Sequence, residues 1–311
     1  MATYRLDPDR PNLHGKFNRD LSPVLTIDSG DTVIYRTLDA GWSVGPPGPD
    51  GKPPKVEALN PENDGGHCLS GPVAIRGAEP EMTLEVKIDR IDLGSWGWTS
   101  SGGWSHEVHQ WLGTDKVEEL MYRWKIDPKA LTATNAPGLT LKLRPFMGVM
   151  GMPPAEAGKH STAPPRATGG NLDCKELIAG TSLFLPIAVP GGLFSVGDGH
   201  AVQGDGEACV TAIECPMERV DLTFILHPEM RIKAPRARTE NAWIAFGLSE
   251  DLNKAALLAV EGMTDLMGEQ YGLDRNTALA LASLVVDLRV TQIVNGVKGV
   301  HAVLEDGKIS R

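Results

Sequence analysis

Apolar residues alternate with polar ones through much of the first 230 residues, and this period of two is the feature that most limits the fold. Leu84, Val86 and Ile88 share one face of the segment 83–93 if it is extended, and the segment 220–226 repeats the pattern. Successive side chains of a strand point to opposite faces, so the alternation indicates half-buried strands in sheets with one wet face. Glycine (35 residues) and proline (23) interrupt the chain often, which favours short strands over long helices.

Local patterns refine this prediction. The β-rich runs 24–27 and 32–35 flank the turn sequence Asp-Ser-Gly-Asp, which predicts a hairpin. From about residue 240 the apolar period changes to that of a helix, which Ser249 can cap and Gly272 can end. A second helix is expected after Asp274, and two further strands are expected over 289–294 and 300–304.

We therefore expect a mainly β protein. Residues 1–230 would form a sandwich-like or barrel-like β body that carries the functional site, and residues 231–311 would form a smaller α+β part. The length of 311 residues is about twice the common domain size, so one large domain and two fused ones are both possible.

The composition excludes several classes of protein. Acidic residues (40) outnumber basic ones (30) without any run of Lys or Arg, so nucleic acid is not an expected partner. No apolar run approaches the ~20 residues of a membrane span, and the first residues lack the apolar core of a signal peptide. We therefore expect a cytoplasmic protein without a membrane partner. The four cysteines contain no CxxC pair, which indicates free thiols rather than a zinc ribbon or a disulfide framework.

The segment 194–207 is the richest in residues of metal-ligand type. Glycines separate Asp198, His200, Asp205 and Glu207, and permit tight backbone shapes. Asp198 and His200 are two positions apart, so both side chains point the same way on an extended backbone, and Asp205 and Glu207 have the same spacing. The apolar runs on either side predict strands that would anchor this loop. The pattern favours a metal site, and the alternative is a Gly/Asp turn with solvated carboxylates.

Two other segments could contribute to the same site. In 168–175, Asn171 and Asp173 share a face if the backbone is extended, and the glycines before them permit close approach of a ligand. Asp173 could supply a metal oxygen, and Lys175 could pair with a carboxylate; a plain turn is the alternative. Asp39, at the end of a strand, is a further candidate ligand, although a single carboxylate there is more often structural.

A tryptophan-rich segment over 96–111 is less informative. The sequence His106-Glu107-Val108-His109 within it does not have the spacing of the HExxH zinc motif. We expect a folded loop, a lid or an interface here rather than a cofactor cage. The chain also lacks the G-x-S-x-G elbow and the P-loop.

Taken together, the glycine-rich segments resemble the acetamidase/formamidase family. The most specific match is Gly197-Asp198-Gly199-His200-Ala201 followed by Gln203-Gly204-Asp205-Gly206-Glu207. Gly169-Gly170-Asn171-Leu172-Asp173-Cys174-Lys175 is similar to that family's Gly-Gly-Asn-x-Asp-x-Lys segment. Weaker matches stand in the family's order at 38–40, 70–73, 77–80 and 144–151.

The resemblance implies a metal-dependent amide hydrolase of mostly β architecture, with short aliphatic amides as substrates and ammonia as a product. The chain departs from the family in three places. His67-Cys68-Leu69-Ser70 stands where Asn-Pro-x-Thr is usual, Glu81-Met82 stands where Gly-Asp is common, and Thr168 stands where many members have histidine. These departures concern the substrate pocket rather than the metal-binding segments.

Metal ligands follow from this resemblance as a hypothesis. Asp198 and His200 would hold a divalent metal, with Asp173 and Asp39 completing the set of ligands. Mixed histidine and carboxylate ligands suit zinc, while calcium would suit a second, all-oxygen site. Zinc-bound water can titrate near pH ~7, which would make hydroxide available to attack the amide.

Catalytic roles are assigned on the same basis. Glu207 would take a proton from water and pass it to the leaving nitrogen, and Asn171 would orient the water or the substrate amide. Asp205 is a further catalytic candidate, because Asp205 and Glu207 could exchange roles with Asp198.

Two alternatives to short-amide hydrolysis stay open. The chain could cleave a lactam or a substituted amide, since His67 and the segment 96–111 depart from the family. It could also be a non-catalytic β-rich binding or scaffold protein that keeps the metal site for stability. A homodimer is the default assembly, because twofold oligomers are the commonest closed form.

Overall fold

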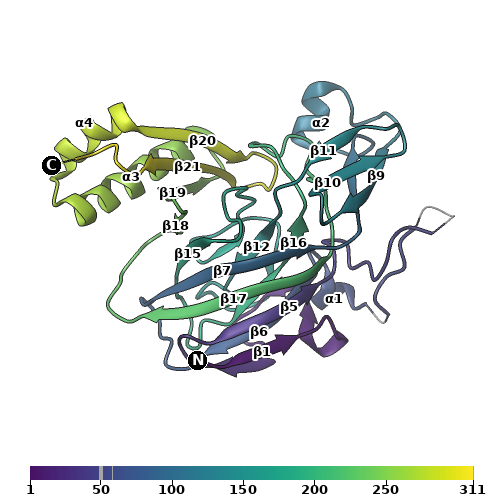
Figure 1. Cartoon of the computed structure of the whole chain (residues 1–311), viewed down its shortest axis with the longest axis horizontal. Coiled ribbons are helices and arrows are strands. Elements are labelled where there is room, and N and C mark those ends of the chain that lie inside the picture. Colours follow the sequence, from purple (N-terminus) through teal and green to yellow (C-terminus); the bar gives the residue numbers. More distant parts are fainter. Residues whose placement is uncertain (49–51, 58, 311) are drawn as a thin grey trace.

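Strands make up most of the regular structure, and the two long helices lie near the C-terminal end of the chain (Figure 1). The computed structural model describes residues 1–48, 52–57 and 59–310. This architecture confirms the mainly β prediction. The helices are a 3-10 turn η1 (Arg10–Asn12), α1 (Pro61–Asp64), α2 (Glu107–Leu112), α3 (Leu252–Tyr271) and α4 (Arg275–Val285).

The described residues form one nine-stranded sheet that runs through the whole molecule. Its strands, in spatial order, are β1 (Thr3–Leu6), β5 (Thr32–Thr37), β17 (Met217–His227), β7 (Thr83–Leu93), β15 (Thr181–Pro186), β18 (Arg236–Arg238), β19 (Ala242–Ser249), β21 (Lys298–Glu305) and β20 (Val286–Gln292). The alternating segments 83–93 and 220–226 lie in its centre as the paired strands β7 and β17.

A second sheet carries the glycine-rich segments. Its order is β14 (Gly169–Asn171), β12 (Phe146–Gly151), β16 (Phe194–His200), β6 (Leu69–Ile75) and β2 (Leu13–His14), with β4 (Leu25–Ile27) also paired to β6. The two sheets share one apolar core, in which Phe194 of β16 meets Phe224 of β17 edge to face at 5.1 Å between ring centres. This packing buries both faces of β16, so polar side chains on that strand are removed from water.

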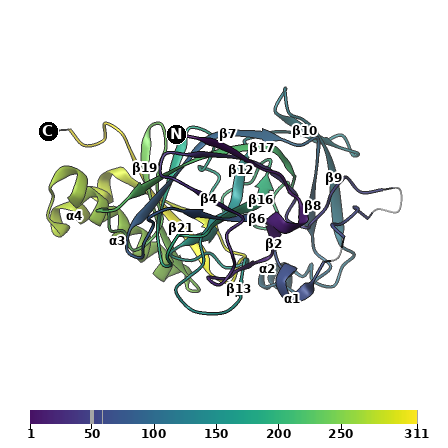
Figure 2. The same ribbon diagram turned by 90° about the horizontal axis from the view of Figure 1, so that it is seen from below.

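Two smaller sheets complete the described β structure. The tryptophan-rich segment contributes to a four-stranded sheet of β11 (Thr140–Lys142), β10 (Thr132–Asn135), β9 (Leu120–Asp127) and β8 (Trp96–Ser101). Strands β13 (His160–Ser161) and β3 (Lys16–Phe17) form a two-stranded pair. Figure 2 shows α3 and α4 at the end of the molecule opposite β8 and β9.

The expected hairpin over 24–35 is wrong in its pairing. Both strands exist, but β4 pairs in parallel with β6, whereas β5 lies between β1 and β17 in the other sheet. The turn between them does form, with the Asp31 amide donating to the Asp28 carbonyl oxygen at 3.1 Å and Gly30 at φ 95°. Local turn chemistry was therefore read correctly, while burial of each strand against a different sheet decided its partner.

The helix ends of the C-terminal part follow their sequence signals except at one position. Ser249, the expected cap of α3, lies before the N-cap residue Asp251, and its hydroxyl oxygen accepts from the Asp251 amide at 3.2 Å. Helix α3 is capped by Asp251, whose carboxylate accepts from the Lys254 amide at 2.7 Å, and it ends at Gly272 with φ 63°. Gly247 of β19 lets the helix approach closely, since a Cβ there would lie 1.9 Å from the Ala255 carbonyl oxygen. A small core of alanine, methionine and leucine side chains fills this contact. The nine-stranded sheet continues across residue 230, so the division into 1–230 and 231–311 stays a prediction, and Arg311 lies outside the described residues.

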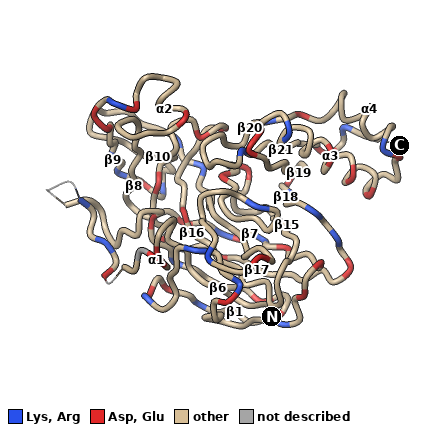
Figure 3. Tube along the Cα trace, turned by 180° about the vertical axis from the view of Figure 1, so that it is seen from behind, with Lys and Arg blue, Asp and Glu red and all other residues tan. Residues whose placement is uncertain are grey.

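Charged residues are dispersed over the molecule. Acidic and basic positions are interspersed along the trace in Figure 3. Among the described residues, no helix is long and apolar enough to cross a membrane.

Candidate metal centre

Five ionisable side chains from distant segments meet around strand β16. Asp198 and His200 lie at the end of that strand, Asp173 follows β14, and Glu207 and Glu214 lie in the loop that leads to β17. The possible ligand atoms of Asp173, Asp198 and His200 lie within 4.8 Å of one another, and so do those of His200, Glu207 and Glu214. All five residues are buried. His200 is therefore the common member of two groups that could hold a cation.

The backbone is strained at three of these carboxylates. Asp173, Asp198 and Glu207 have φ angles of 49°, 58° and 47°. Residues other than glycine seldom adopt this left-handed region, and each such position costs on the order of 1–3 kcal/mol. The fold thus maintains an unfavourable conformation to aim these side chains inward, as is common at functional sites.

The ring of His200 is oriented by an amide side chain. Its Nδ1 lies 2.9 Å from Gln203 Oε1, and because an amide oxygen can only accept, Nδ1 donates. The amide group of Gln203 in turn donates to the Asp173 carbonyl oxygen at 2.9 Å. His200 Nε2 therefore faces the carboxylates, 3.3 Å from Asp198 Oδ1 and 3.2 Å from Glu214 Oε2. Such an outer contact fixes the tautomer that a metal-binding histidine needs.

Asp173 receives a contact from the C-terminal part of the chain. Asn295, in the loop between β20 and β21, donates from Nδ2 to Asp173 Oδ2 at 2.5 Å. The loop is braced by Gln292, whose Oε1 accepts from the amides of Val294 (2.9 Å) and Asn295 (3.2 Å). The other carboxylate oxygen, Asp173 Oδ1, is left to face the cluster. The C-terminal part thus helps to orient a residue of the β body.

Two more residues line the cluster. His67 places Nε2 4.0 Å from Asp198 Oδ2, and its Nδ1 is 2.9 Å from the hydroxyl oxygen of Thr162. Gly148 of β12 faces the cluster directly, since a Cβ there would lie 2.5 Å from Asp198 Oδ2 and 2.7 Å from Asp173 Oδ1. The absence of a side chain at Gly148 keeps the space between these carboxylates open.

Burial and mutual repulsion dominate the electrostatics of the cluster. Burial raises the pKa of Asp173 to about 6 and that of Glu214 to about 7. Burial, together with the charge of Asp173, raises the pKa of Glu207 well above its ordinary value. Burial acts in the same direction on Asp198, but the charges of His200 and His67 outweigh it and lower its pKa. Without a cation, the fold would have to hold several of these groups in their protonated forms.

The donor set fits a divalent metal. Asp173 Oδ1, Glu207 Oε2 and Glu214 Oε2 are buried and make no hydrogen bond within the described part of the chain. Unsatisfied buried carboxylate oxygens are costly unless a cation or proton compensates them. The lone pair of His200 Nε2 faces the same space. Together these atoms provide the mixed nitrogen and oxygen ligands that zinc accepts.

The predicted site residues are only partly brought together. Asp173, Asp198, His200 and Glu207 join the cluster. Asp205 does not: its carboxylate pairs with Lys175 at 2.8 Å on the partly exposed side of the loop. The expected common direction of the side chains at 205 and 207 is therefore wrong, because this segment is a turn rather than a strand.

Asp39 and Asn171 are buried but differ in their contacts. Asp39 accepts from the Ser43 amide at 2.6 Å and from Trp98 Nε1 at 2.9 Å, one bond to each carboxylate oxygen, and it belongs to neither metal-capable group. Asn171 donates from Nδ2 to the Ala163 carbonyl oxygen at 3.1 Å, while its Oδ1 has no hydrogen bond within the described residues. The assignments of all the predicted site residues stay predictions.

Sequence reasoning missed Glu214 and Asn295. Glu214 follows Ile213 in an ordinary apolar stretch, and Asn295 lies in a turn of the C-terminal part, so neither carried a local signal. His67 was noted only as a departure from the family pattern. The tertiary fold alone brings these three residues to the cluster.

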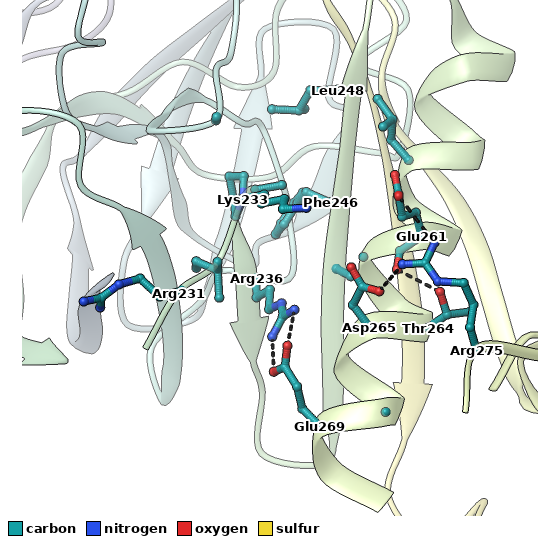
Figure 4. Close-up of a pocket in the computed structure, with 18 of the residues that line it drawn as sticks. Arg231, Lys233, Arg236, Phe246, Leu248, Glu261, Thr264, Asp265, Glu269 and Arg275 are labelled. Atoms are coloured by element: carbon teal, nitrogen blue, oxygen red, sulfur yellow. Dashed lines mark hydrogen bonds and ion pairs between the residues drawn. The ribbon is translucent and has the colours of Figure 1, made fainter. Parts of the chain in front are cut away.

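A pocket away from the cluster lies between α3 and the segment 231–236 (Figure 4). It has a volume of about 720 Å³ and an apolar wall that includes Phe246 and Leu248. Two ion pairs lie among its lining residues, with Arg236 bound to Glu269 at 2.6 Å and Arg275 to Asp265 at 2.7 Å. None of the cluster residues lines it.

Sequence comparison places these features among known proteins. Residues 2–160 and 155–303 match the profile of the Acetamidase/Formamidase family. The formamidase of Methylophilus methylotrophus is 27% identical over 246 residues, which are 63% of this chain and 59% of that protein. The acetamidase of Mycolicibacterium smegmatis is 26% identical over 257 residues, which are 62% of this chain and 61% of that protein. These matches span less than two thirds of the length of either relative.

Structure comparison agrees over nearly the whole chain. The crystal structure of an acetamidase from Bacillus halodurans has a TM-score of 0.83 and 27% identity, with 97% of each chain covered. A gamma lactamase from Delftia acidovorans has a TM-score of 0.62 and 20% identity, with 100% of this chain and 94% of that chain covered. The second likeness concerns the fold alone.

Proposed function

We propose that this chain, which belongs to the acetamidase/formamidase family, hydrolyses the C–N bond of short linear amides to a carboxylate and ammonia. The observation that carries the proposal is the buried cluster, where three carboxylate oxygens without hydrogen bonds within the described residues belong to two metal-capable groups that share His200. Such an arrangement has no evident structural benefit, because unpaired buried charges destabilise a fold. It is suited to hold a cation next to a reacting molecule.

The proposed ligands are His200 Nε2, Asp198 and Asp173, with Glu214 close enough to join them. An amide C–N bond has partial double-bond character, so its hydrolysis needs a strong nucleophile and a polarised carbonyl group. A divalent metal, when bound, acts as a Lewis acid and lowers the pKa of water. Zinc suits this mixed set of donors, whereas calcium would suit a second, all-oxygen site. We leave Asp39 out of the set, because both of its oxygens already accept hydrogen bonds.

Glu207 is our candidate for the proton-transfer residue. Its raised pKa and its buried Oε2 without a hydrogen bond suit a group that accepts a proton from water and then donates it to the leaving nitrogen. Asn171 Oδ1 is free to accept from a substrate N–H group. The salt bridge of Asp205 with Lys175 gives Asp205 a role in fixing the loop that carries Glu207.

The test is ammonia release from a panel of amides by the purified chain. We expect formamide and acetamide to be hydrolysed, metal to be present in near-stoichiometric amount by elemental analysis, and a chelator to abolish turnover. Readdition of zinc should restore it. Full activity in a metal-free preparation would overturn the metal-dependent scheme, and a metal-loaded chain that is inert on every amide would support the scaffold alternative.

A lactam or substituted amide is the second candidate substrate. The gamma lactamase has the same fold in outline, and His67 with its partner Thr162 gives the cluster an imidazole where the family pattern has none. Including lactams and N-substituted amides in the panel separates the two candidates. Turnover of these compounds with formamide and acetamide inert would favour the second. A cytoplasmic location and a homodimer are also part of the proposal.

A further inference from the structure

The C-terminal end of the nine-stranded sheet has an uncovered edge. Strand β20 is its last strand and pairs with β21 on one side. On the other side, the Gly206 amide donates to the Thr291 carbonyl oxygen at 3.0 Å, and the Ile293 amide donates to the Gly206 carbonyl oxygen at 3.2 Å. This cover reaches only the end of the strand. The segment Val286–Val290 forms no strand pair on its outer side within the described residues, and Figure 1 shows it along the outer border of the C-terminal part.

The opposite edge of the same sheet is protected in the usual way. Strand β1 is short, and Arg5 within it is tied to Asp7 by two hydrogen bonds. Short and charged edge strands discourage pairing with other chains. Strand β20 is longer and has neither proline nor lysine, and its two charged residues, Asp287 and Arg289, are of opposite sign. It therefore presents an open pairing edge where the other end of the sheet does not.

Apolar side chains beside this edge are exposed. The register with β21 sets Leu288 opposite Ala302 and Val290 opposite Val300, on the face that packs against the helices. The helices stop short of the edge, because Leu288 is 48% exposed and Val290 is 37% exposed. Leu284, at the end of α4, is 78% exposed. Three exposed apolar side chains thus lie on β20 or just before it.

We propose that β20 pairs with β20 of a second copy of this chain, in an antiparallel twofold dimer centred on Leu288. The sequence Val286-Asp287-Leu288-Arg289-Val290 is complementary to itself in this register. Leu288 then meets Leu288 of the second copy, Val286 meets Val290, and Asp287 meets Arg289. Opposite charges and apolar pairs at facing positions of antiparallel strands each stabilise the pairing. A twofold axis repeats every one of these contacts.

The charges needed for this contact are available. Asp287 is exposed and has no hydrogen bond or ion pair within the described residues. Arg289 binds Glu176 at 2.9 Å through one nitrogen and stays partly exposed. A guanidinium has five N–H donors, so Arg289 can keep Glu176 and also bind Asp287 of the second copy.

The size of the contact sets the expected strength. Stable interfaces bury about 800 Å² on each partner. A short strand pair covers less than this, and Leu284 beside it adds apolar area. We therefore expect a dimer that forms and dissociates with concentration rather than a permanent one.

Sedimentation velocity of the full-length chain over a wide concentration range tests the proposal. The unchanged chain should dimerise. D287R and R289D each put like charges opposite one another, and each should weaken dimerisation by about tenfold or more. A mixture of the two variants should dimerise again, because D287R carries two positive charges that face the two negative charges of R289D.

Matched controls separate this contact from other effects. E176Q removes the internal partner of Arg289 and should leave the dimer intact, and L288K should weaken it. Circular dichroism of each variant reports whether it is folded. Recovery of the dimer on mixing is a second check, because an unfolded variant could not pair with the other. A chain that is monomeric at all concentrations, or a dimer that none of these variants weakens, would overturn the proposal. Amide hydrolysis is measured separately, so its absence would leave this proposal standing.

Discussion

The buried cluster around His200 and the open pocket beside α3 differ in how their charges are compensated. The pocket has a volume of about 720 Å³, and the carboxylates of Glu269 and Asp265 in its wall pair with Arg236 and Arg275. The cluster is much tighter, and three of its carboxylate oxygens lack hydrogen bonds within the described residues. Three of its residues also have strained backbones, whereas the pocket is lined by none of the non-glycine residues with positive φ in the described part of the chain.

From this difference we expect the chemistry in the cluster rather than in the pocket. Exposed ion pairs contribute little to the free energy of folding. Unpaired buried groups are costly, so the fold keeps them only where something compensates them. If the cluster is the catalytic centre, substitutions there should change metal content and amide turnover, and substitutions in the pocket should change neither.

The largest effect is expected from His200→Ala. This change removes the residue that both metal-capable groups share. We expect loss of bound metal and a fall in amide turnover of about a thousandfold or more. Elemental analysis and ammonia release measure the two effects. A variant that keeps both its metal and its turnover would show that the cluster is not the catalytic centre.

A smaller but more selective effect is expected from Glu207→Gln. The amide keeps the size of the side chain but cannot transfer a proton, so turnover should fall by about a hundredfold to a thousandfold while metal content stays close to normal. Asp205→Asn is the matched control, because it changes a carboxylate in the same loop outside the cluster. If Asp205→Asn proves the more harmful change for turnover, the roles of the two residues must be exchanged.

Buried histidine outside the cluster should make stability depend on pH. His14 lies between the Lys16 carbonyl oxygen and the Ser195 hydroxyl group, and burial lowers its pKa from 6.5 to about 4. The unfolded chain binds this proton below pH ~6.5 and the folded chain does not, so the free energy of unfolding falls as the pH drops from about 6.5 to about 4. The full effect is about 3 kcal/mol.

Chemical denaturation of the unchanged chain and of His14→Gln across this pH range measures the effect. The variant should be less stable at neutral pH but should lose less stability on acidification. Parallel curves for the two proteins would show that His14 does not contribute to the pH dependence.

The hydrogen bond from Asn295 in the β20–β21 loop to Asp173 should affect metal affinity. Asn295→Ala removes the donor to Asp173 Oδ2, and the loss of such an outer contact weakens metal binding by about tenfold to a hundredfold. Competition with a chelating dye measures the affinity without reference to turnover. Asn295→Asp should be worse than Asn295→Ala, because it adds a negative charge beside Asp173; the reverse order would argue against an orienting role.

The smallest effect is expected in the pocket. Glu269→Gln breaks the ion pair with Arg236 at a partly exposed site, and should cost less than about 1 kcal/mol of stability. Amide turnover should not change. A loss of turnover comparable to that of Glu207→Gln would mean that the pocket, and not the cluster alone, serves the reaction.

Residues close in sequence carried most of what could be predicted. The alternation over 83–93 predicted strand β7 with its correct first and last residues. Gly272 correctly marked the end of α3, and Asp274 correctly marked the start of α4. The glycine-spaced segments led to Asp173, Asp198, His200 and Glu207, which do meet. The two-residue spacing wrongly predicted that Asp205 and Glu207 point the same way, because the backbone at Asp205 is a turn and not an extended strand.

The sequence by itself determined the strand-rich character of the chain, the helix ends at Gly272 and Asp274, and the kind of chemistry that its acids and histidine can perform. These properties depend on the side-chain period and on neighbours a few positions apart. The tertiary structure alone decided that β4 and β5 enter different sheets. It also brought His67 to Asp198, Glu214 to His200 and Asn295 to Asp173. Long-range packing makes such choices, because burying an entire strand outweighs the preference of any single turn.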